Sequence, residues 1–473
     1  MIGERHKAAL VEILGANGVV QDSTCMAVYE NGARYDRGNA AFVLRPRSTQ
    51  EVSACVAYCV REDIALVPQS GNTGLVSGST PDDSGAQVVL SLERMTQVFD
   101  LDIDNRSLHV DAGLRLSDIN GRLEHSGLFF PIDLGADPRA GGMLATNTGG
   151  SRFLKYGDVR RNTLGVKVVL ADEVGTVVDL LSGLRKNNTG VDWKQLFVGT
   201  SGAFGIVTEC VLNLELLPRQ VSTAYLVPRA RTGVMALLRL MEERLGSYLS
   251  AFEGMSSNAV GAALAHVPSL RNPFQNGDIP EYVILAEISR SWAPREGEQP
   301  LDAVLETVLA EIWEVEASPL ADAFVGPAHE MWALRHALSE GVKHAGRLVA
   351  FDLAFRRADV QAFCDCMKAE LPGRFADVAI FDFGHIGDGG IHFNLVVDET
   401  RVGPVDGHFE QRLRDWVYSV AVDRFGGSFS AEHGIGRKNQ AYYNLYTQQK
   451  NKDLAAGLKR LTSPGSVGSV CFG

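Results

Sequence analysis

The sequence has few of the features that mark secreted, membrane or nucleic-acid-binding proteins. Its seven cysteines are odd in number and scattered, so neither a disulfide framework nor a pair of CxxC zinc motifs is present. No apolar run is long enough to cross a bilayer, and the N-terminus lacks the apolar core of a signal peptide. Basic residues are outnumbered, 45 against 57, and the net charge of −12 argues against a nucleic-acid partner. We therefore expect a cytoplasmic protein without nucleic acid or a membrane segment.

Two common nucleotide-binding motifs are also missing. The chain contains neither GxGxxG nor GxxxxGK[ST], so Rossmann and P-loop sites lose support. Apolar residues make up 45% and charged residues 22%, which is typical of a globular protein and excludes a disordered chain. Glycine is in excess, with 49 residues, and these glycines are clustered. Their clusters carry the first functional signal.

The first 217 residues begin with a β-α-β pattern. A strand at 40–44 precedes a helix that Ser48 and Glu51 open as a capping box, and a second strand follows at 64–67. Cys55 and Cys59 lie on the apolar face of that helix, which indicates core residues. Further strands are predicted; they cover residues 87–92, 97–101 and 107–111.

The pattern changes after residue 217. Longer helical patterns appear at 233–245, 301–315 and 358–371, separated by polar loops, which predicts helices packed on a mostly antiparallel sheet. The fold class is therefore α+β. We expect three regions: residues 1–217 with the strands and most of the clustered glycines, residues 218–425 with the helices on a sheet, and a C-terminal segment at 426–473.

A glycine-rich loop follows the strand at 64–67. Gly71, Gly74 and Gly78 alternate with Ser70, Asn72 and Thr73. Glycines allow successive backbone N–H groups to turn inward and form an anion-binding nest. A tight structural turn is the alternative, but it does not require hydroxyl and amide side chains between the glycines.

Two more glycine-rich stretches follow, at 131–150 and 199–208. Taken in order and spacing over residues 38–217, the three stretches resemble the vanillyl-alcohol-oxidase (PCMH-type) flavoprotein family. The resemblance implies bound FAD, with the first loop at the pyrophosphate and the others at the isoalloxazine and adenine ends. The residues it implies are Pro68, Gln69, Ser70, Gly71, Asn72, Thr73, Gly74, Pro131, Asp133, Gly142, Asn147, Gly150, Gly202 and Ile206. Some members attach FAD to a histidine in the first loop, but residues 67–78 contain none, so we expect non-covalent FAD.

A second signal lies at residues 383–394. Asp388-Gly389 is a strong hairpin turn signal, and a two-residue turn there would place His385 opposite His392 on one face. Asn394 joins that face because side chains alternate along a strand. Two opposed imidazoles are half of a metal site; the alternative is a hydrogen-bonded structural corner.

Glu432 is the obvious third ligand, in a glycine-flanked motif that also contains His433. Two histidines and a carboxylate with an open position form a catalytic zinc arrangement, although manganese and iron also suit these ligands. A helix-capping His433 is the alternative interpretation. We expect a divalent metal, zinc as first choice, bound by His385, His392 and Glu432.

This second block resembles the C-terminal domain of FAD-linked D-2-hydroxy-acid dehydrogenases. The resemblance implies His433 as the base, Asn394 at the substrate, and Arg335 of the Trp332–Arg335 motif at the substrate carboxylate. A bidentate guanidinium suits that last role. The implied reaction oxidises a D-2-hydroxy acid to the 2-oxo acid with FAD as hydride acceptor. The absence of a membrane segment favours a soluble electron acceptor, such as an electron-transfer flavoprotein.

Substrate choice is the open point. We expect D-2-hydroxyglutarate first, D-lactate or a similar monocarboxylate second, an oxidase using O₂ third, and a non-catalytic flavin- or metal-binding protein last. Dicarboxylate-selective members tend to carry a lysine where this chain has Ala350. The cations that remain for a distal carboxylate are Lys343, Arg347, Arg356 and Arg357.

Overall fold

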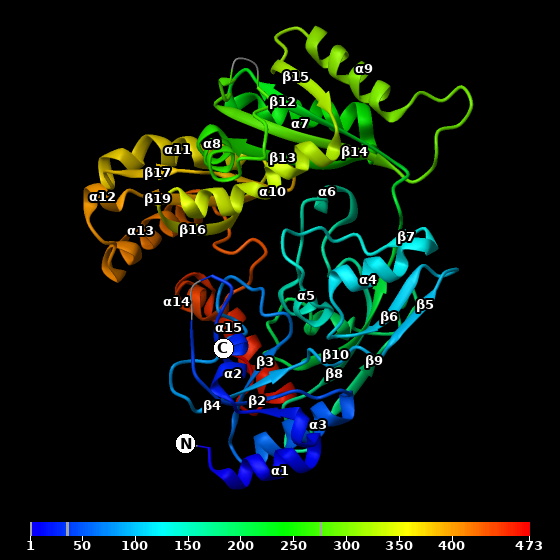
Figure 1. Ribbon diagram of the computed structural model, residues 1–473, viewed down its shortest axis with the longest axis vertical. Helices are drawn as coiled ribbons and strands as arrows, with labels where there is room; N and C mark the ends of the chain where they lie inside the picture. The colour runs from blue at the N-terminus through cyan, green and yellow to red at the C-terminus, as the bar shows by residue number, and fades with distance from the viewer. Residues whose placement is uncertain (1, 35–36, 275–276) are drawn as a thin grey trace. The chain divides into compact units, whose positions relative to one another are not determined.

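The computed structural model describes residues 2–34, 37–274 and 277–473 (Figure 1). The chain divides into two compact units. Unit 1 comprises Met1–Gly149, Asp158–Leu216 and Glu432–Gly473, and unit 2 comprises Gly150–Gly157 and Leu217–Ala431. No helix within the described residues combines the length and apolar character that a membrane crossing requires.

Unit 1 begins with a four-stranded sheet and the predicted β-α-β crossover. In order across the sheet, its strands are β1 (Val19–Val20), β2 (Ala40–Leu44), β4 (Gln87–Ser91) and β3 (Ala65–Gln69). Strands β2, β4 and β3 are parallel, and β1 is antiparallel to β2. The helix α3 (Thr49–Arg61) connects β2 to β3, and α1 (Glu4–Leu14) packs against it.

The start of α3 confirms Ser48 as its N-cap: the Ser48 hydroxyl accepts a hydrogen bond from the Glu51 N–H at 3.2 Å. The return bond of the predicted capping box is shifted by one residue, because the Glu51 carboxylate accepts from the Arg47 N–H at 2.7 Å and not from the Ser48 N–H. Cys55 and Cys59 are fully buried in the core beneath this helix, as expected of core residues. Burial raises the pKa of the Cys59 thiol to about 12, so this thiol stays protonated.

A second sheet of unit 1 is antiparallel throughout. In order, its strands are β5 (Phe99–Asp102), β6 (Ser107–Asp111), β10 (Ile206–Asn213), β8 (Thr163–Val169) and β9 (Val177–Leu180). The helix α5 (Ala140–Thr146) packs on β10 and β6, and α4 (Leu116–Leu123) shares the same apolar core. The helices α14 (Gly436–Tyr446) and α15 (Gln449–Thr462) also belong to unit 1, where Leu66 of β3 donates its N–H to Ser466 O at 2.9 Å.

Unit 2 is built on one antiparallel sheet, as predicted. In order, its strands are β15 (Leu320–Gly326), β12 (Gln220–Pro228), β14 (Tyr282–Arg290), β13 (Leu249–Ser256), β18 (Phe383–Gly384), β19 (Gly390–Val397) and β16 (Arg347–Ala354). A further strand, β17 (Val378–Ile380), pairs with β19.

Helices pack on the unit 2 sheet and form its core. The helices α8 (Ser257–His266) and α10 (Ala328–His344) pack together and share one apolar core with β13, β14 and β18 (Figure 1). The helices α7 (Val234–Leu245) and α9 (Leu301–Glu314) begin and end within one residue of their predicted bounds. The helix α11 (Asp359–Arg374) continues past Pro372 and so ends three residues later than predicted. These elements confirm the α+β class.

Candidate active site

The three glycine-rich loops of unit 1 approach one another closely. A Cβ atom at Gly202 would lie 3.6 Å from the Pro68 side chain, and one at Gly142 would lie 3.5 Å from Ser70 Cβ. The third loop is tied to the second because the Gly199 N–H donates to Leu144 O at 2.8 Å. Three segments far apart in the sequence therefore meet, as an extended cofactor that contacts all of them requires.

Side chains in the first loop hold its backbone in shape. Asn72 has a φ of +52°, and its side-chain amide donates to Asn31 O at 2.8 Å and Val28 O at 3.2 Å. Gln69 is buried and donates to Tyr29 O and Ser79 O. At Gly74, next to Thr73, a Cβ would meet no other atom of the described residues within 4 Å. The loop is thus held by its own side chains and leaves open space at Gly74, which fits a pyrophosphate.

The other residues implied at FAD lie in different settings. Asn147 ends α5 with a φ of +52°, and its side chain binds Asp158 and the Arg160 N–H, both at 2.8 Å. Ile206 begins β10 and is buried in the core. The remaining ones are loop residues: Pro131 and Asp133 follow β7 (Leu128–Phe129), and Gly150, with a φ of +128°, belongs to unit 2.

One face of the unit 2 sheet gathers the predicted polar residues. Met255, Phe383, His392 and Asp352 are successive cross-strand partners on β13, β18, β19 and β16. His392 Nδ1 lies 3.9 Å from Asp352 Oδ1, and both side chains offer metal-ligating atoms. Alternation along each strand adds further residues to this face, including Asn394 on β19.

The predicted hairpin register is wrong by two residues. Phe383, not His385, lies opposite His392, and Asp388-Gly389 do not form a two-residue turn. Residues 385–389 form a longer loop, in which the Gly390 N–H bonds His385 O and the Gly387 N–H bonds Phe252 O of β13. The hydrogen bond to β13 outweighs the local preference of Asp388-Gly389 for a two-residue turn. Because the shift is even, both histidines stay on one face, with ring centroids 5.3 Å apart.

A buried glutamate that the sequence analysis missed binds two of the predicted site residues. Glu253 Oε1 lies 2.8 Å from His385 Nδ1. Its Oε2 accepts a hydrogen bond from Arg335 Nε at 2.9 Å and lies 2.7 Å from Nη2 in an ion pair. Glu253 is 1% exposed and Arg335 is 7% exposed. Burial alone would raise the pKa of Glu253, but His385 and Arg335 lower it to about 2. Glu253 is therefore a carboxylate at neutral pH.

Asn394 is buried on β19 opposite Ala350 of β16. Its side-chain amide donates weakly to Phe381 O at 3.3 Å and His392 O at 3.2 Å. These contacts use the amide nitrogen, so they orient the side chain within the sheet face that carries His392. The small side chain of Ala350 offers no charge to that face.

Glu432 and His433 follow the last residue of unit 2. Within unit 2, the Ala431 N–H donates to Asp352 O at 3.2 Å, and Ser428 pairs with Ala354 in both directions. In unit 1, His433 Nε2 lies 3.7 Å from Glu432 Oε1, and both side chains offer metal-ligating atoms. The segment that leads to Glu432 is thus hydrogen-bonded to β16.

The four cations considered for a distal carboxylate lie in ion pairs on the surface. Their partners are Glu340 for Lys343, Glu410 for Arg347, Asp359 for Arg356 and Glu242 for Arg357. Each of the four side chains is at least 44% exposed. This arrangement favours the interpretation that they are solvated surface charges.

A second buried glutamate lies on β14. Glu287 receives two hydrogen bonds from Arg152, at 2.7 and 2.8 Å, and others from Trp332 and Ser250. Burial alone would raise the pKa of its carboxyl, but the bonds and charge of Arg152 lower it. Both glutamates interrupt apolar strands of the sequence, which is the signal that could have identified them; charged residues are rarely buried without a partner.

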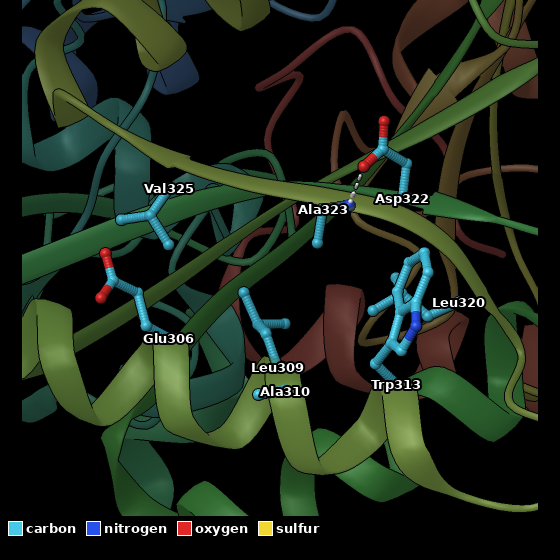
Figure 2. A pocket seen from close by; sticks show the side chains of 8 residues that line it. All are labelled: Glu306, Leu309, Ala310, Trp313, Leu320, Asp322, Ala323 and Val325. Atoms are coloured by element: carbon cyan, nitrogen blue, oxygen red, sulfur yellow. Dashed lines mark hydrogen bonds between the residues drawn. The ribbon is translucent and has the colours of Figure 1, made fainter.

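A groove between α9 and β15 is not part of this arrangement (Figure 2). Its volume is about 360 Å³, and none of the predicted site residues lines it. Its charged side chains, Glu306 and Asp322, are both carboxylates, which repel an anionic acid. The exposed indole of Trp313 forms part of its wall.

Comparisons with known proteins find two matching families along the chain. Residues 40–180 match the family described as FAD binding domain, and residues 217–466 match that described as FAD linked oxidases, C-terminal domain. A mitochondrial D-2-hydroxyglutarate dehydrogenase of Rattus norvegicus is 33% identical over 98% of this chain and 84% of its own length. The enzyme of that name in Arabidopsis thaliana is 31% identical over 96% and 79%. A D-2-hydroxyglutarate–pyruvate transhydrogenase of Saccharomyces cerevisiae is 31% identical over 86% and 81%.

Solved structures share the fold at low sequence identity. An alkyldihydroxyacetonephosphate synthase has a TM-score of 0.71 at 15% identity, covering 98% of this chain and 84% of its own. A p-cresol methylhydroxylase has a TM-score of 0.71 at 14% identity, covering 98% and 95%. The fold expectation is confirmed. Because the plant and animal relatives are named mitochondrial, the cytoplasmic location stays a prediction.

The Arg152–Glu287 pair gives a prediction for stability. Arg152→Ala leaves a buried carboxylate without its main cation, which costs about 3 kcal/mol, at the low end for a broken buried pair, because a quarter of the Arg152 side chain is exposed. The folded pKa of Glu287 is lowered, so the pair stabilises the fold above the unfolded pKa and loses this effect as the pH falls through the folded value.

The measurement is the thermal midpoint of wild type and variant from pH 7.5 down to pH 3.5. The difference between them should be large at neutral pH and shrink on acidification. Lys155→Ala is the matched control, because Lys155 binds the Ser289 carbonyl and hydroxyl from the same segment. Equal pH dependence for the two variants contradicts the assignment.

Proposed function

Since the chain belongs to the family of FAD-linked oxidases and is an FAD-dependent oxidoreductase acting on the CH–OH group of D-2-hydroxy acids, we propose that its substrate is D-2-hydroxyglutarate and that a divalent metal ion assists. The observation that carries the proposal is the sheet face of unit 2, where His385, His392 and Asn394 lie together with Arg335. Such a set of imidazole, amide and guanidinium groups suits a hydroxy acid bound through its carboxylate and hydroxyl.

We infer that the metal ligands are His385, His392 and Glu432. Imidazole and carboxylate are ligand types that zinc, manganese and iron accept, and zinc remains our first choice. Asp352 lies opposite His392 and supplies a further carboxylate beside this set. When bound, such an ion polarises a coordinated hydroxyl oxygen and lowers its pKa.

The protein side chains then have distinct roles. Arg335 binds the C1 carboxylate, and Asn394 orients the substrate from β19. His433 takes the hydroxyl proton on Nε2; the Glu432 carboxylate, 3.7 Å away, stabilises the imidazolium that results. Bound FAD supplies the acceptor for the hydride from the substrate Cα.

A monocarboxylate such as D-lactate is the second candidate substrate. Ala350 contributes no cation, and the four cations near it in sequence are engaged at the surface. A buried, unpaired distal carboxylate would cost several kcal/mol. D-2-hydroxyglutarate ranks first because the relatives that match nearly the full chain carry its name.

For the electron acceptor we propose a soluble electron-transfer flavoprotein. The name of the yeast relative offers a second 2-oxo acid, such as pyruvate, as the alternative acceptor. Stopped-flow reoxidation of the substrate-reduced enzyme distinguishes the two. Rapid reoxidation by pyruvate or by O₂ would show that this compound, and not the flavoprotein, is the electron acceptor.

The substrate proposal predicts a higher kcat/KM for D-2-hydroxyglutarate than for D-lactate. The measurement is a panel of D- and L-2-hydroxy acids with a dye acceptor, with and without a chelator. The L-isomers should be inactive, and the chelator should abolish turnover. If D-lactate is the better substrate, the part of the pocket beyond C1 is apolar, and Ala350 in place of a lysine is the residue that indicates it.

The flavin should be released into solution when the protein is precipitated with acid or heat. This follows from the absence of histidine in residues 67–78 and from the use of Asn72 to hold the loop backbone. Absorbance at 450 nm in the supernatant measures the release. Yellow colour that stays with the precipitate shows a covalent bond instead.

The metal proposal predicts that His385→Ala, His392→Ala and Glu432→Ala each lose bound metal and most activity but keep FAD. The flavin loops lie far from these residues in the sequence, so flavin content should not change. Elemental analysis and the 450 nm absorbance test both points. His344→Ala, an exposed histidine of the same unit, is the matched control. Wild-type metal content in all three variants would refute the ligand set.

Arg335→Ala and His433→Ala should affect different kinetic constants. Loss of Arg335 removes binding common to substrate and transition state, so KM rises for every 2-hydroxy acid. Loss of His433 removes a general base and should lower kcat by about 10²–10⁴-fold. Steady-state kinetics at saturating metal separate the effects on KM and kcat. The control is Arg347→Ala, which removes an arginine from an exposed ion pair. A near-normal kcat in His433→Ala would contradict the role of His433 as the general base.

A further inference from the structure

Glu253 is a charged residue in the apolar core of unit 2. It lies on β13 two residues before Met255, so both side chains point to the face that α8 and α10 cover. The side chain is 1% exposed, and both oxygens are engaged, Oε1 by His385 and Oε2 by Arg335. An apolar residue there would continue the surrounding core, whereas a buried carboxylate must be paired.

We propose that Glu253 is a positioning residue that prepares His385 for the metal and Arg335 for the substrate carboxylate at the same time. The inference rests on the function proposed above, because it takes those two roles as given. It adds a single group that links the metal subsite to the carboxylate subsite. Glu253 itself touches neither metal nor substrate.

The bond to His385 selects one form of the imidazole. Glu253 Oε1, 2.8 Å from His385 Nδ1, accepts a hydrogen bond from the protonated nitrogen. A neutral ring that carries its proton on Nδ1 has its lone pair on Nε2, which is then the nitrogen able to bind a cation. The carboxylate also raises the basicity of Nε2 and holds the ring plane in place. Without the Glu253 carboxylate, metal binding would itself have to fix the orientation of the His385 ring, which would weaken the binding.

The bonds to Arg335 select one edge of the guanidinium. Glu253 Oε2 accepts a hydrogen bond from Nε and lies 2.7 Å from Nη2, and these two nitrogens form the side edge of the group. The end edge, formed by Nη1 and the second hydrogen of Nη2, is the fork that remains for a substrate carboxylate. The ring of Phe383 lies 5.1 Å from the guanidinium carbon and limits its movement. Glu253 therefore fixes where the C1 carboxylate of a substrate is held.

Glu287 provides a matched control for the packing role of a buried glutamate. It lies on the neighbouring strand, is also 1% exposed, and binds Arg152, Trp332 and Ser250 rather than the predicted site residues. Glu253→Gln and Glu287→Gln keep side-chain size and remove one charge each. A structural role predicts similar effects of the two substitutions, and a positioning role predicts different ones.

The first measurement is zinc affinity of the FAD-loaded, chelator-stripped protein, titrated against a chromophoric chelator. Glu253→Gln should raise the Kd for zinc about 10–100-fold, the usual effect of losing a partner of a metal-bound histidine. Glu287→Gln should leave it within twofold of wild type. In a His385→Ala background, Glu253→Gln should have no further effect, since it acts through His385. Equal Kd changes in the two glutamine variants overturn the inference.

The second measurement is the division between KM and kcat at saturating zinc. Glu253→Gln should raise KM for D-2-hydroxyglutarate and D-lactate by the same factor, at least fivefold, because both share the C1 carboxylate. Its kcat should fall less than threefold. If the glutamine variant does not fold, Glu253→Asp is measured against Glu287→Asp with the same criteria. Wild type that binds no zinc refutes the proposed function itself, whereas zinc binding and KM unchanged by Glu253 substitution refute only this inference.

Discussion

The arrangement of unit 2 depends on one requirement: two carboxylates buried on one face of its sheet must each be paired. Glu253 and Glu287 cannot be buried as charges without cations and donors around them. Arg152 of the short segment 150–157 meets that need for Glu287, and this segment accordingly belongs to unit 2 although both of its chain neighbours belong to unit 1. Arg335 and His385 meet it for Glu253. Pairing requirements therefore determine which parts of the chain are held against the sheet.

Because side chains alternate along a strand, the predicted grouping of the two histidines holds although the predicted register is wrong. The predicted hairpin placed His385 opposite His392, and the structure places Phe383 there. A shift of one residue would have sent one histidine to the other face, but a shift of two keeps both on the same face. The grouping of residues is thus more robust than their pairing. Patterns of polar residues two apart predict a shared face even where the turn is misread.

Local signals in the sequence were sufficient for much of the fold. The N-cap Ser48, the strand Ala40–Leu44 and the bounds of α7 follow from nearest neighbours and from periodicity, and the structure confirms them. Glu253 was missed because its partners are 82 and 132 residues away, and a local pattern contains no information on such pairs. The five-residue loop that begins at His385 was missed for the same reason, since a bond to β13 determines it. Sequence reasoning thus predicts which side chains form the candidate site, whereas the structure was needed to find the buried groups that hold them.

The segment that precedes Glu432 is held by the sheet of unit 2. Ser428 and Ala431 are hydrogen-bonded to Ala354 and Asp352 of β16, so the segment runs along the sheet edge until one residue before Glu432. The backbone of Asp352 accepts the bond from Ala431, while its side chain lies beside His392. One strand therefore orders both the sheet face that carries His392 and the last residues of unit 2 before Glu432. A disturbance of β16 would accordingly reach the His392 face and the segment 428–431 together, as expected where one rigid element supports several polar groups.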